Sequence, residues 1–427
     1  MTLIKTSILS GIATIIQVLS GFIITKTIAV LIGPSGLAFL GQFQNFIALV
    51  MALGTASITT GVIKYTAEHQ QNLEEKKRLW STALRLAFIG SFMSAILLVL
   101  FHTQLSLFFF KTERYSSLFI IFAITLLFYV INTLLMAILN GQKEIKKLIT
   151  IKISSSITTL TLIIFFTYTY GLYGALLSLI LGQSIVFLVT LTFVLKSPWF
   201  QWSMFEQTIH IEYLKKLGKY AAMAIVAALS APLSELIIRN YIGTSISWDD
   251  AGYWQATWKI SSVYLMVITM TLSIYYLPKL SEIKEGRALQ QEILTGYKII
   301  LPLTIILAII VYFCRDFIIL ILFTETFTPM RDLFFYQLLG DVLKITSWLI
   351  SFLMVAKAMT KVFIITEIIG FISYIILSIL FIDHYGLTGA PMAFALNMFL
   401  YSLLIFWIFK NLIIYGKLST ISLKSSS

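Results

Sequence analysis

The chain is 427 residues long, 59% hydrophobic and only 12% charged. Soluble domains are roughly 45–50% apolar and about 25% charged, so this composition excludes an ordinary soluble protein. The formal net charge of +12 does not predict nucleic-acid binding, because the sequence has no separate soluble domain to carry such a surface.

Apolar runs of about 20 residues recur along the chain, and each is long enough to cross the core of a bilayer as a helix. Within lipid the backbone must satisfy its own hydrogen bonds, so helices are expected. The predicted spans, in chain order, are 8–31, 36–63, 81–104, 116–139, 147–169, 172–195, 216–242, 251–277, 295–313, 331–355, 362–382 and 387–410. We therefore predict an all-α polytopic membrane protein with about 12 transmembrane helices. The apolar stretch 316–323 is too short to cross and is predicted to end the ninth helix or to lie at the interface.

The first span follows Lys5, which makes a signal peptide the alternative interpretation. Its apolar run is too long for one and no small-x-small cleavage site follows, so we expect an uncleaved span. With the N-terminus in the cytoplasm, the inner segments hold most of the 31 Lys and Arg residues, whereas the outer turns 32–35 and 170–172 hold none. Excess Lys and Arg marks the cytoplasmic side, so both termini are predicted to lie inside. The net charge then mainly reflects topology and contact with anionic membrane lipids.

A short sequence is repeated between the two halves. The hexapeptide YGLYGA at Tyr170–Ala175 returns as YGLTGA at Tyr385–Ala390, about half the chain later. At a similar offset Lys64 corresponds to Lys279, and Lys26 falls near Arg239. Such an internal repeat predicts two similar halves.

Six helices per half return the chain to its starting side, so the halves share one orientation. We therefore predict two six-helix bundles related by a pseudo-twofold axis along the membrane normal, the arrangement of transporters that bind substrate between their halves. The predicted domains are an N-terminal bundle (1–195), a cytoplasmic interhalf linker (196–215) and a C-terminal bundle with a short tail (216–427). Because Trp199, Trp202 and Phe205 make the linker partly apolar, it is either an amphipathic stretch on the inner surface or an ordinary loop.

Sequence signatures of enzymes are missing. There is no Gly-x-x-x-x-Gly-Lys-Ser/Thr run and no Gly-x-Ser-x-Gly motif, and the four histidines form no pair at i, i+4. Cys314 is the only cysteine, so neither an intrachain disulfide nor a thiolate metal site is expected. The short outer loops also disfavour a membrane polymerase. We expect a protein that is not an enzyme and that has no cofactor and no metal.

Ionisable residues in or near the spans are the candidate functional residues, because a charge at the bilayer centre costs roughly 2.5–3.5 kcal/mol on insertion scales. These are Lys26, Glu235, Arg239, Asp249, Asp250, Lys259, Arg331, Asp332, Asp341, Lys344 and Glu367.

Several of these residues also have a purely structural explanation. Glu235 and Arg239 at i, i+4, and Asp341 and Lys344 at i, i+3, have the spacing of helical ion pairs. Lys26 either snorkels to the outer face or lines a cavity. Acidic residues suit helix starts at two places: Asp249 with Asp250 as a cap, and Asp332 beside Arg331.

Lys259 has no acidic neighbour at helical spacing, which favours a place in a polar cavity. Basic residues outnumber unpaired acids in the first, seventh and eighth spans. Such a cavity favours an anion such as a phosphate or a diphosphate. A cavity for cationic drugs would instead need unpaired Asp or Glu residues deep in the spans.

Several motifs together resemble a known family. They are Gly33–Leu37 (GPSGL), Ser247–Gln255 (SWDDAGYWQ), Tyr275–Ser281 (YYLPKLS), Arg315–Phe317 (RDF), Met330–Phe334 (MRDLF) and Gln337–Lys344 (QLLGDVLK). Across essentially the whole chain the sequence resembles the bacterial lipid-linked oligosaccharide flippases. The similarity is strongest to lipid III (enterobacterial common antigen) flippases and O-antigen unit translocases, of the multidrug/oligosaccharidyl-lipid/polysaccharide exporter superfamily.

This resemblance implies a substrate, undecaprenyl diphosphate carrying an oligosaccharide, moved from the cytoplasmic to the periplasmic leaflet of the bacterial inner membrane. It implies alternating access, with the diphosphate bound by basic residues. The positions that match the family are the expected substrate-binding residues Lys26, Arg239, Lys64 and Lys344 and the possible coupling sites Asp341 and Glu367. Lys259 departs from the lipid III flippase pattern and is an expected substrate-binding residue from its position in a span alone, which leaves open a different sugar. The polymerase and the chain-length regulator of the same pathway are possible partners. The alternatives are a multidrug antiporter of the same superfamily, a lipid II flippase, whose family usually has fourteen helices, and a membrane polysaccharide polymerase.

Overall fold

The computed structural model describes residues 3–55 and 57–417, and every regular element in those two ranges is helical. Contacts divide the chain into two units, Met1–Leu233 and Ser234–Ser427. Each unit is described by itself below. The domain boundaries predicted at residues 195 and 216 stay a prediction.

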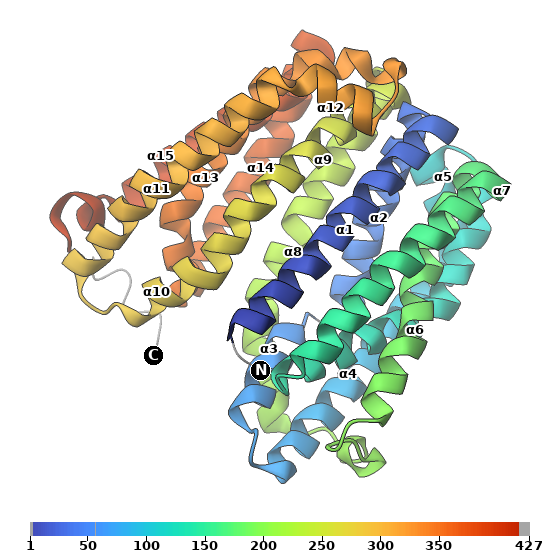
Figure 1. Ribbon diagram of the computed structural model, residues 1–427, viewed down its shortest axis with the longest axis vertical. Helices are drawn as coiled ribbons and strands as arrows, with labels where there is room; N and C mark the ends of the chain where they lie inside the picture. Colours follow the sequence, from blue (N-terminus) through green and yellow to red (C-terminus); the bar gives the residue numbers. More distant parts are fainter. Residues whose placement is uncertain (1–2, 56, 418–427) are drawn as a thin grey trace. The chain divides into compact units, whose positions relative to one another are not determined.

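The N-terminal unit is built from apolar helices and a few short connecting turns. Its elements are α1 (Leu3–Leu31), α2 (Pro34–Gly54), α3 (Thr59–Glu68), α4 (Leu73–Leu100), α5 (His102–Phe110), η1 (Glu113–Tyr115), α6 (Ser116–Gly141), α7 (Ile145–Leu195), η2 (Trp202–Phe205) and the first part of α8 (Ile211–Ser245). In this unit α1 packs against α7, and α6 packs against both α4 and α7 (Figure 1).

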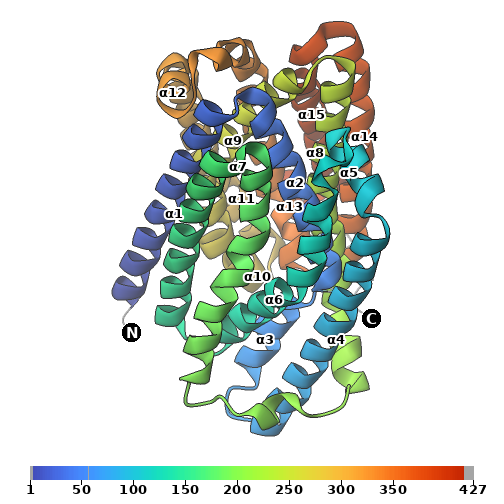
Figure 2. The same ribbon diagram turned by 90° about the vertical axis from the view of Figure 1, so that its right-hand side faces the viewer.

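The C-terminal unit begins within α8. Its further elements are α9 (Trp248–Thr271), the π-helical η3 (Leu272–Tyr276), α10 (Leu277–Glu282), α11 (Gly286–Phe313), α12 (Arg315–Leu322), η4 (Glu325–Leu333), α13 (Phe334–Ala356), α14 (Thr360–Tyr385), η5 (Gly386–Thr388) and α15 (Gly389–Tyr415). The helix α13 packs against α9, α11 and α15, while α14 lies beside α15 (Figure 2). Buried side chains of α9, η3, α11, α13 and α15 form the core of this unit.

The described part of the chain contains ten helical segments that are long and apolar enough to cross a membrane. Two of them, of 51 and 56 residues, are far longer than the roughly 20 residues that one crossing needs. Each reverses at a glycine of the repeated hexapeptide: Gly171 (φ 57°, ψ −135°) and Gly386 (φ 61°, ψ −144°). Past the first turn, the Ser178 hydroxyl donates to the carbonyl of Leu162 at 3.0 Å. The ten segments therefore accommodate the twelve predicted crossings.

Two predicted element boundaries were wrong. The second predicted span, 36–63, is broken, because α2 ends at Gly54 and Ser57 adopts a left-handed φ of 49° before α3 begins. The stretch 316–323 does not end the ninth helix, because a separate short helix, α12, follows Cys314; its interfacial position stays a prediction. Arg331 and Asp332 do not start an α-helix. They lie in the 3₁₀ segment η4, where Arg331 forms an ion pair of 3.0 Å with Asp316.

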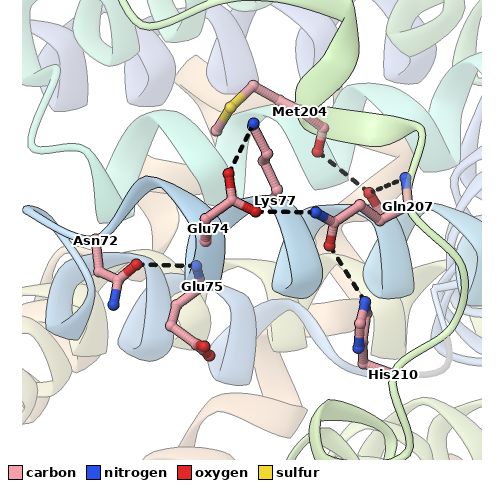
Figure 3. A network of polar contacts seen from close by, with 8 residues as sticks. Asn72, Glu74, Glu75, Lys77, Met204, Gln207 and His210 are labelled. Carbon is pink, nitrogen blue, oxygen red and sulfur yellow. Dashed lines mark hydrogen bonds and ion pairs between the residues drawn. The ribbon is translucent and has the colours of Figure 1, made fainter.

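The predicted interhalf linker packs onto α4 within the N-terminal unit. Its Met204 is fully buried, and the Trp199 ring lies 5.2 Å from the Trp80 ring, centroid to centroid. The Met204 carbonyl accepts from the Ser81 hydroxyl at 3.3 Å, and the Gln207 side chain donates to Glu74 at 3.2 Å (Figure 3). Backbone groups of this segment are thereby satisfied by α4 side chains, as burial of a loop requires.

The start of α8 continues this polar network. Tyr213 donates its hydroxyl hydrogen bond to Glu75 of α4. Burial, together with this bond, raises the pKa of Tyr213 above its usual range. A hydrogen bond and ion pair with Lys216 lower the pKa of the exposed Glu212 carboxyl. The linker is therefore a packed segment and neither a free loop nor an isolated amphipathic strip.

Candidate functional site

The candidate site lies in the C-terminal unit and starts from a tight helical hairpin. The helices α8 and α9 are separated by two residues, and Ser247 caps α9 by accepting from the backbone N–H of Asp250 at 3.0 Å. Ser247, not Asp249 or Asp250, is the N-cap, and the two acids stand in the first turn, where the helix dipole favours them. Arg239 and Gln255 each lie eight residues from Ser247, so the antiparallel hairpin places them side by side.

Arg239 is fully buried and bound to polar partners on both helices of the hairpin. Its guanidinium lies 3.5 Å from the Glu235 carboxylate and donates to the side-chain oxygen of Gln255. The same group lies 5.4 Å from the centroid of the Trp254 ring, at cation–π distance. The predicted Glu235–Arg239 ion pair is confirmed. A buried guanidinium is tolerated here because the carboxylate, the amide and the aromatic ring replace its water.

Asp341 joins α13 to α9. Its carboxylate accepts from the Tyr264 hydroxyl at 2.8 Å and from the Gln337 amide at 3.4 Å. The side chain is almost completely buried. The predicted ion pair between Asp341 and Lys344 is wrong, because no ion pair between these two side chains is found in the described part of the chain. The Asp341 carboxylate instead accepts hydrogen bonds from a hydroxyl and an amide.

Lys344 lies between two tryptophans. Its ammonium is 4.7 Å from the ring centroid of Trp348 and 5.9 Å from that of Trp258. Lys344 and Lys259 are both half-buried, and no ion pair to either ammonium is found among residues 3–55 and 57–417. The structure thus places two half-buried lysines within predicted spans of one unit, and one of them, Lys344, lies beside aromatic rings.

Glu367 of α14 accepts a hydrogen bond of 3.3 Å from the Tyr401 hydroxyl of α15. It lies half-buried in its span. Nearby on the same two helices, Ser373 donates to Asn397. Within the described residues, no group of three His, Cys, Asp or Glu side chains could hold a metal ion. The two acids, Asp341 and Glu367, are thus each bound to a tyrosine on a neighbouring helix.

The other two predicted site residues belong to the N-terminal unit. Lys26 is half-buried in α1. Lys64 is exposed on α3, with its ammonium 5.3 Å from the centroid of the Tyr65 ring. The roles predicted for these two lysines remain predictions.

The charge-based search missed the neutral side chains that hold the charges. Gln255, Trp254 and Trp258 of α9 and Tyr264 were not predicted as site residues, although they contact Arg239, Lys344 or Asp341. One signal was available: the two-residue connection at 246–247 pairs positions equally distant from it, which brings Gln255 to Arg239. The tryptophans carry no such signal, because aromatic residues are common throughout this chain.

Comparisons with known proteins match nearly the entire chain. A family model described as polysaccharide biosynthesis protein matches residues 12–332. Over 403 residues the chain is 29% identical to the lipid III flippase of Escherichia coli (strain K12), covering 94% of this chain and 96% of that protein. It is 24% identical to a candidate O-antigen transporter of Shigella flexneri, covering 89% of this chain and 91% of that one.

Solved structures share the fold. A multidrug resistance transporter in an inward-facing conformation matches with a TM-score of 0.80 and 15% identity, covering 96% of each chain. A lipid II flippase in an inward closed conformation matches with a TM-score of 0.75 and 17% identity, covering 95% of this chain and 87% of that chain. At such identities the likeness extends to the architecture alone.

Proposed function

The chain belongs to the polysaccharide biosynthesis protein family, and on that premise we propose that it is a flippase for a lipid-linked oligosaccharide. Its substrate is an undecaprenyl diphosphate carrying a short oligosaccharide, which it moves from the cytoplasmic to the periplasmic leaflet of the inner membrane. The proposal is supported by similarity to a lipid III flippase over almost the full length of both chains. The first choice of substrate is therefore lipid III of the enterobacterial common antigen.

One observation carries the choice of an anionic headgroup as cargo. Lys259 and Lys344 lie within predicted spans without an ion-paired carboxylate among the described residues, whereas Asp341 and Glu367 each accept a hydrogen bond from a tyrosine. An unpaired ammonium within a span is costly, so a transient anionic partner offsets that cost. A diphosphate supplies such a partner, and Lys binds phosphate as a point charge.

The proposed mechanism assigns different tasks to the cationic residues. Lys259 and Lys344 contact the diphosphate, and Lys26 and Lys64 of the N-terminal unit are further substrate-binding residues. Arg239, already held by Glu235 and Gln255, positions α8 against α9 and contacts the diphosphate only when that pairing rearranges. With no nucleotide-binding motif in the sequence, an ion gradient, the membrane potential or product removal by a polymerase sets the direction, with Asp341 and Glu367 as the coupling sites.

Genetic complementation tests the substrate. The gene is expressed in one strain that lacks its lipid III flippase and in a second that lacks its O-antigen translocase, and polymer is measured at the surface of each. Restored common antigen in the first strain alone is the expected result. Restored O-antigen alone supports the second candidate function, O-antigen unit translocation, which the match to the Shigella flexneri protein favours. Polymer in neither strain, with the protein present in the membrane, would falsify the flippase proposal.

A further inference from the structure

The N-terminal unit contains a cavity that none of the predicted site residues lines and whose largely apolar wall includes several amide and hydroxyl side chains. It lies among α2, α6 and α7, three helices in mutual contact, and has a volume of about 460 Å³. This volume falls in the range of roughly 300–1,000 Å³ that is typical of small-molecule sites. The side chains around it are Gln44, Ile47, Ala48, Met51, Tyr129, Thr133, Thr159, Leu179 and Gln183.

The polar groups of this cavity are hydroxyls and amides, and none of its lining side chains is charged. The Gln183 side chain accepts from Asn132 at 3.3 Å and donates to Ser155 at 3.2 Å, which orients its amide. Asn132 is not itself a lining residue; it is 4% exposed, and its side-chain oxygen has no hydrogen-bond partner among the described residues. The hydroxyl of Tyr129 likewise has no hydrogen bond to another described residue.

This chemistry discriminates among possible occupants. Polar side chains in a membrane span are costly unless they meet water, protein or ligand partners. A prenyl chain would leave the amides and hydroxyls without partners. A diphosphate or a metal ion would find no countercharge in the lining. Sugar hydroxyls both donate and accept, as do amide and hydroxyl side chains, and the Tyr129 ring offers an apolar face to a sugar ring.

We propose that this cavity binds one uncharged sugar unit. The proposal rests on the proposed function, in that the sugar would belong to the oligosaccharide of the transported lipid. The headgroup would then be recognised at two places, its charge by lysines and one sugar ring by the neutral cavity between α2, α6 and α7.

The test uses free sugars, so it does not depend on transport. Cys314, the only cysteine, is exposed and is first replaced by serine. Thr133→Cys then places a thiol in the cavity wall of the purified full-length protein, and its labelling rate with a small maleimide is measured with and without glucose or N-acetylglucosamine. At least one of the two sugars is expected to slow labelling saturably. A cysteine at Asn411, exposed in the other unit, is the control and should react at the same rate throughout.

Two further substitutions test the lining. Tyr129→Phe and Gln44→Leu break no side-chain hydrogen bond to another described residue, so folding should be preserved. Each removes one hydrogen bond to the sugar. The sugar concentration that gives half-maximal protection from labelling should therefore rise about fivefold to tenfold. Tyr168→Phe removes a hydroxyl from an exposed tyrosine outside the cavity and should leave protection unchanged.

The possible outcomes are distinct. Labelling that neither sugar slows at saturation overturns the sugar site, even if complementation has succeeded. Equal slowing of labelling at the Asn411→Cys control also overturns the sugar site. So does equal slowing at Thr133→Cys when a short alkyl chain is added in place of the sugar. Protection that Tyr129→Phe and Gln44→Leu weaken supports the site, even if the complementation experiment fails. The sugar site and the flippase proposal therefore fail by different measurements.

Discussion

At the scale of single residues, the cationic side chains of the C-terminal unit fall into two kinds. Arg239 is enclosed by a carboxylate, an amide and a tryptophan ring. Lys344 lies at cation–π distance from two tryptophan rings and forms no ion pair among the described residues. In the first arrangement a carboxylate on the same helix neutralises the charge, whereas the second arrangement contains no such ion pair.

The Arg239 arrangement predicts an asymmetric mutational effect. Arg239→Ala leaves the Glu235 carboxylate in a span without its guanidinium and should lower stability by about 3–5 kcal/mol. The double variant Glu235→Gln with Arg239→Gln removes both charges and should be closer to wild type. Thermal unfolding of the purified proteins in detergent measures the difference. Equal stability of the single and double variants would contradict a structural role for this ion pair.

The Lys344 and Lys259 arrangement predicts a loss of transport without a loss of protein. Lys344→Gln and Lys259→Gln each remove a charge-assisted contact to the diphosphate, which should slow transport roughly 10–100-fold. Polymer formation in the complemented strain, normalised to membrane protein, is the measurement. Lys361→Gln, at an exposed position at the start of α14, is the matched control. If a variant that carries both substitutions transports at the wild-type rate, neither lysine belongs to the mechanism.

At the scale of elements, the repeated hexapeptide forms a tight turn between two helical segments in each half of the chain. Gly171 and Gly386 share nearly the same backbone angles, with positive φ and strongly negative ψ. The glycine three residues later lies against the preceding helix in both copies. A Cβ at Gly174 would approach the carbonyl oxygen of Phe166 to 1.8 Å, and one at Gly389 would approach that of Phe381 to 2.1 Å. Both glycines of the motif are therefore required, the first for conformation and the second for close packing.

These turns predict a conformational cost for alanine. Gly386→Ala or Gly171→Ala should destabilise the protein by about 1–3 kcal/mol, because only glycine adopts these angles readily, although a Cβ would meet no atom within 4 Å. Thermal unfolding in detergent is again the measurement. Gly21→Ala in α1, where a Cβ also meets nothing, should instead be neutral or slightly stabilising. An equal loss of stability from Gly21→Ala and Gly386→Ala would show that the backbone angles of the turn do not cause the cost.

At the scale of the whole molecule, the chain is a multi-pass membrane protein of the polysaccharide biosynthesis family. Its orientation in the membrane follows only from the distribution of Lys and Arg. Alkaline phosphatase fused after Thr112, in a predicted outer turn, should be active. The same enzyme fused after Lys357, in a predicted inner turn, should be inactive. If only the fusion after Lys357 is active, the protein has the opposite orientation in the membrane, and the proposed direction of transport is wrong.

The helical class, the twelve crossings and the family were predictable from the sequence, because hydropathy and glycine turns are local properties. Lipid leaves the backbone no alternative to helices, so apolar length is enough to place the spans. The Glu235–Arg239 pair was predictable because residues four apart in the sequence are neighbours on the surface of a helix. The break between α2 and α3, where Ser57 adopts its left-handed φ, has no such local signal.

Only the tertiary structure decided which groups bind the remaining charges. Asp341 is three residues from Lys344, yet it is bound by Tyr264, 77 residues away in sequence. The amides and hydroxyls of the cavity among α2, α6 and α7 come from segments separated by up to 139 residues. Contacts between helices depend on how their faces pack, and neither charge pattern nor hydropathy encodes that packing. Sequence alone therefore determined the fold class and the family, whereas the packing of the helices determined which side chains surround the buried charges and which line the cavity among α2, α6 and α7.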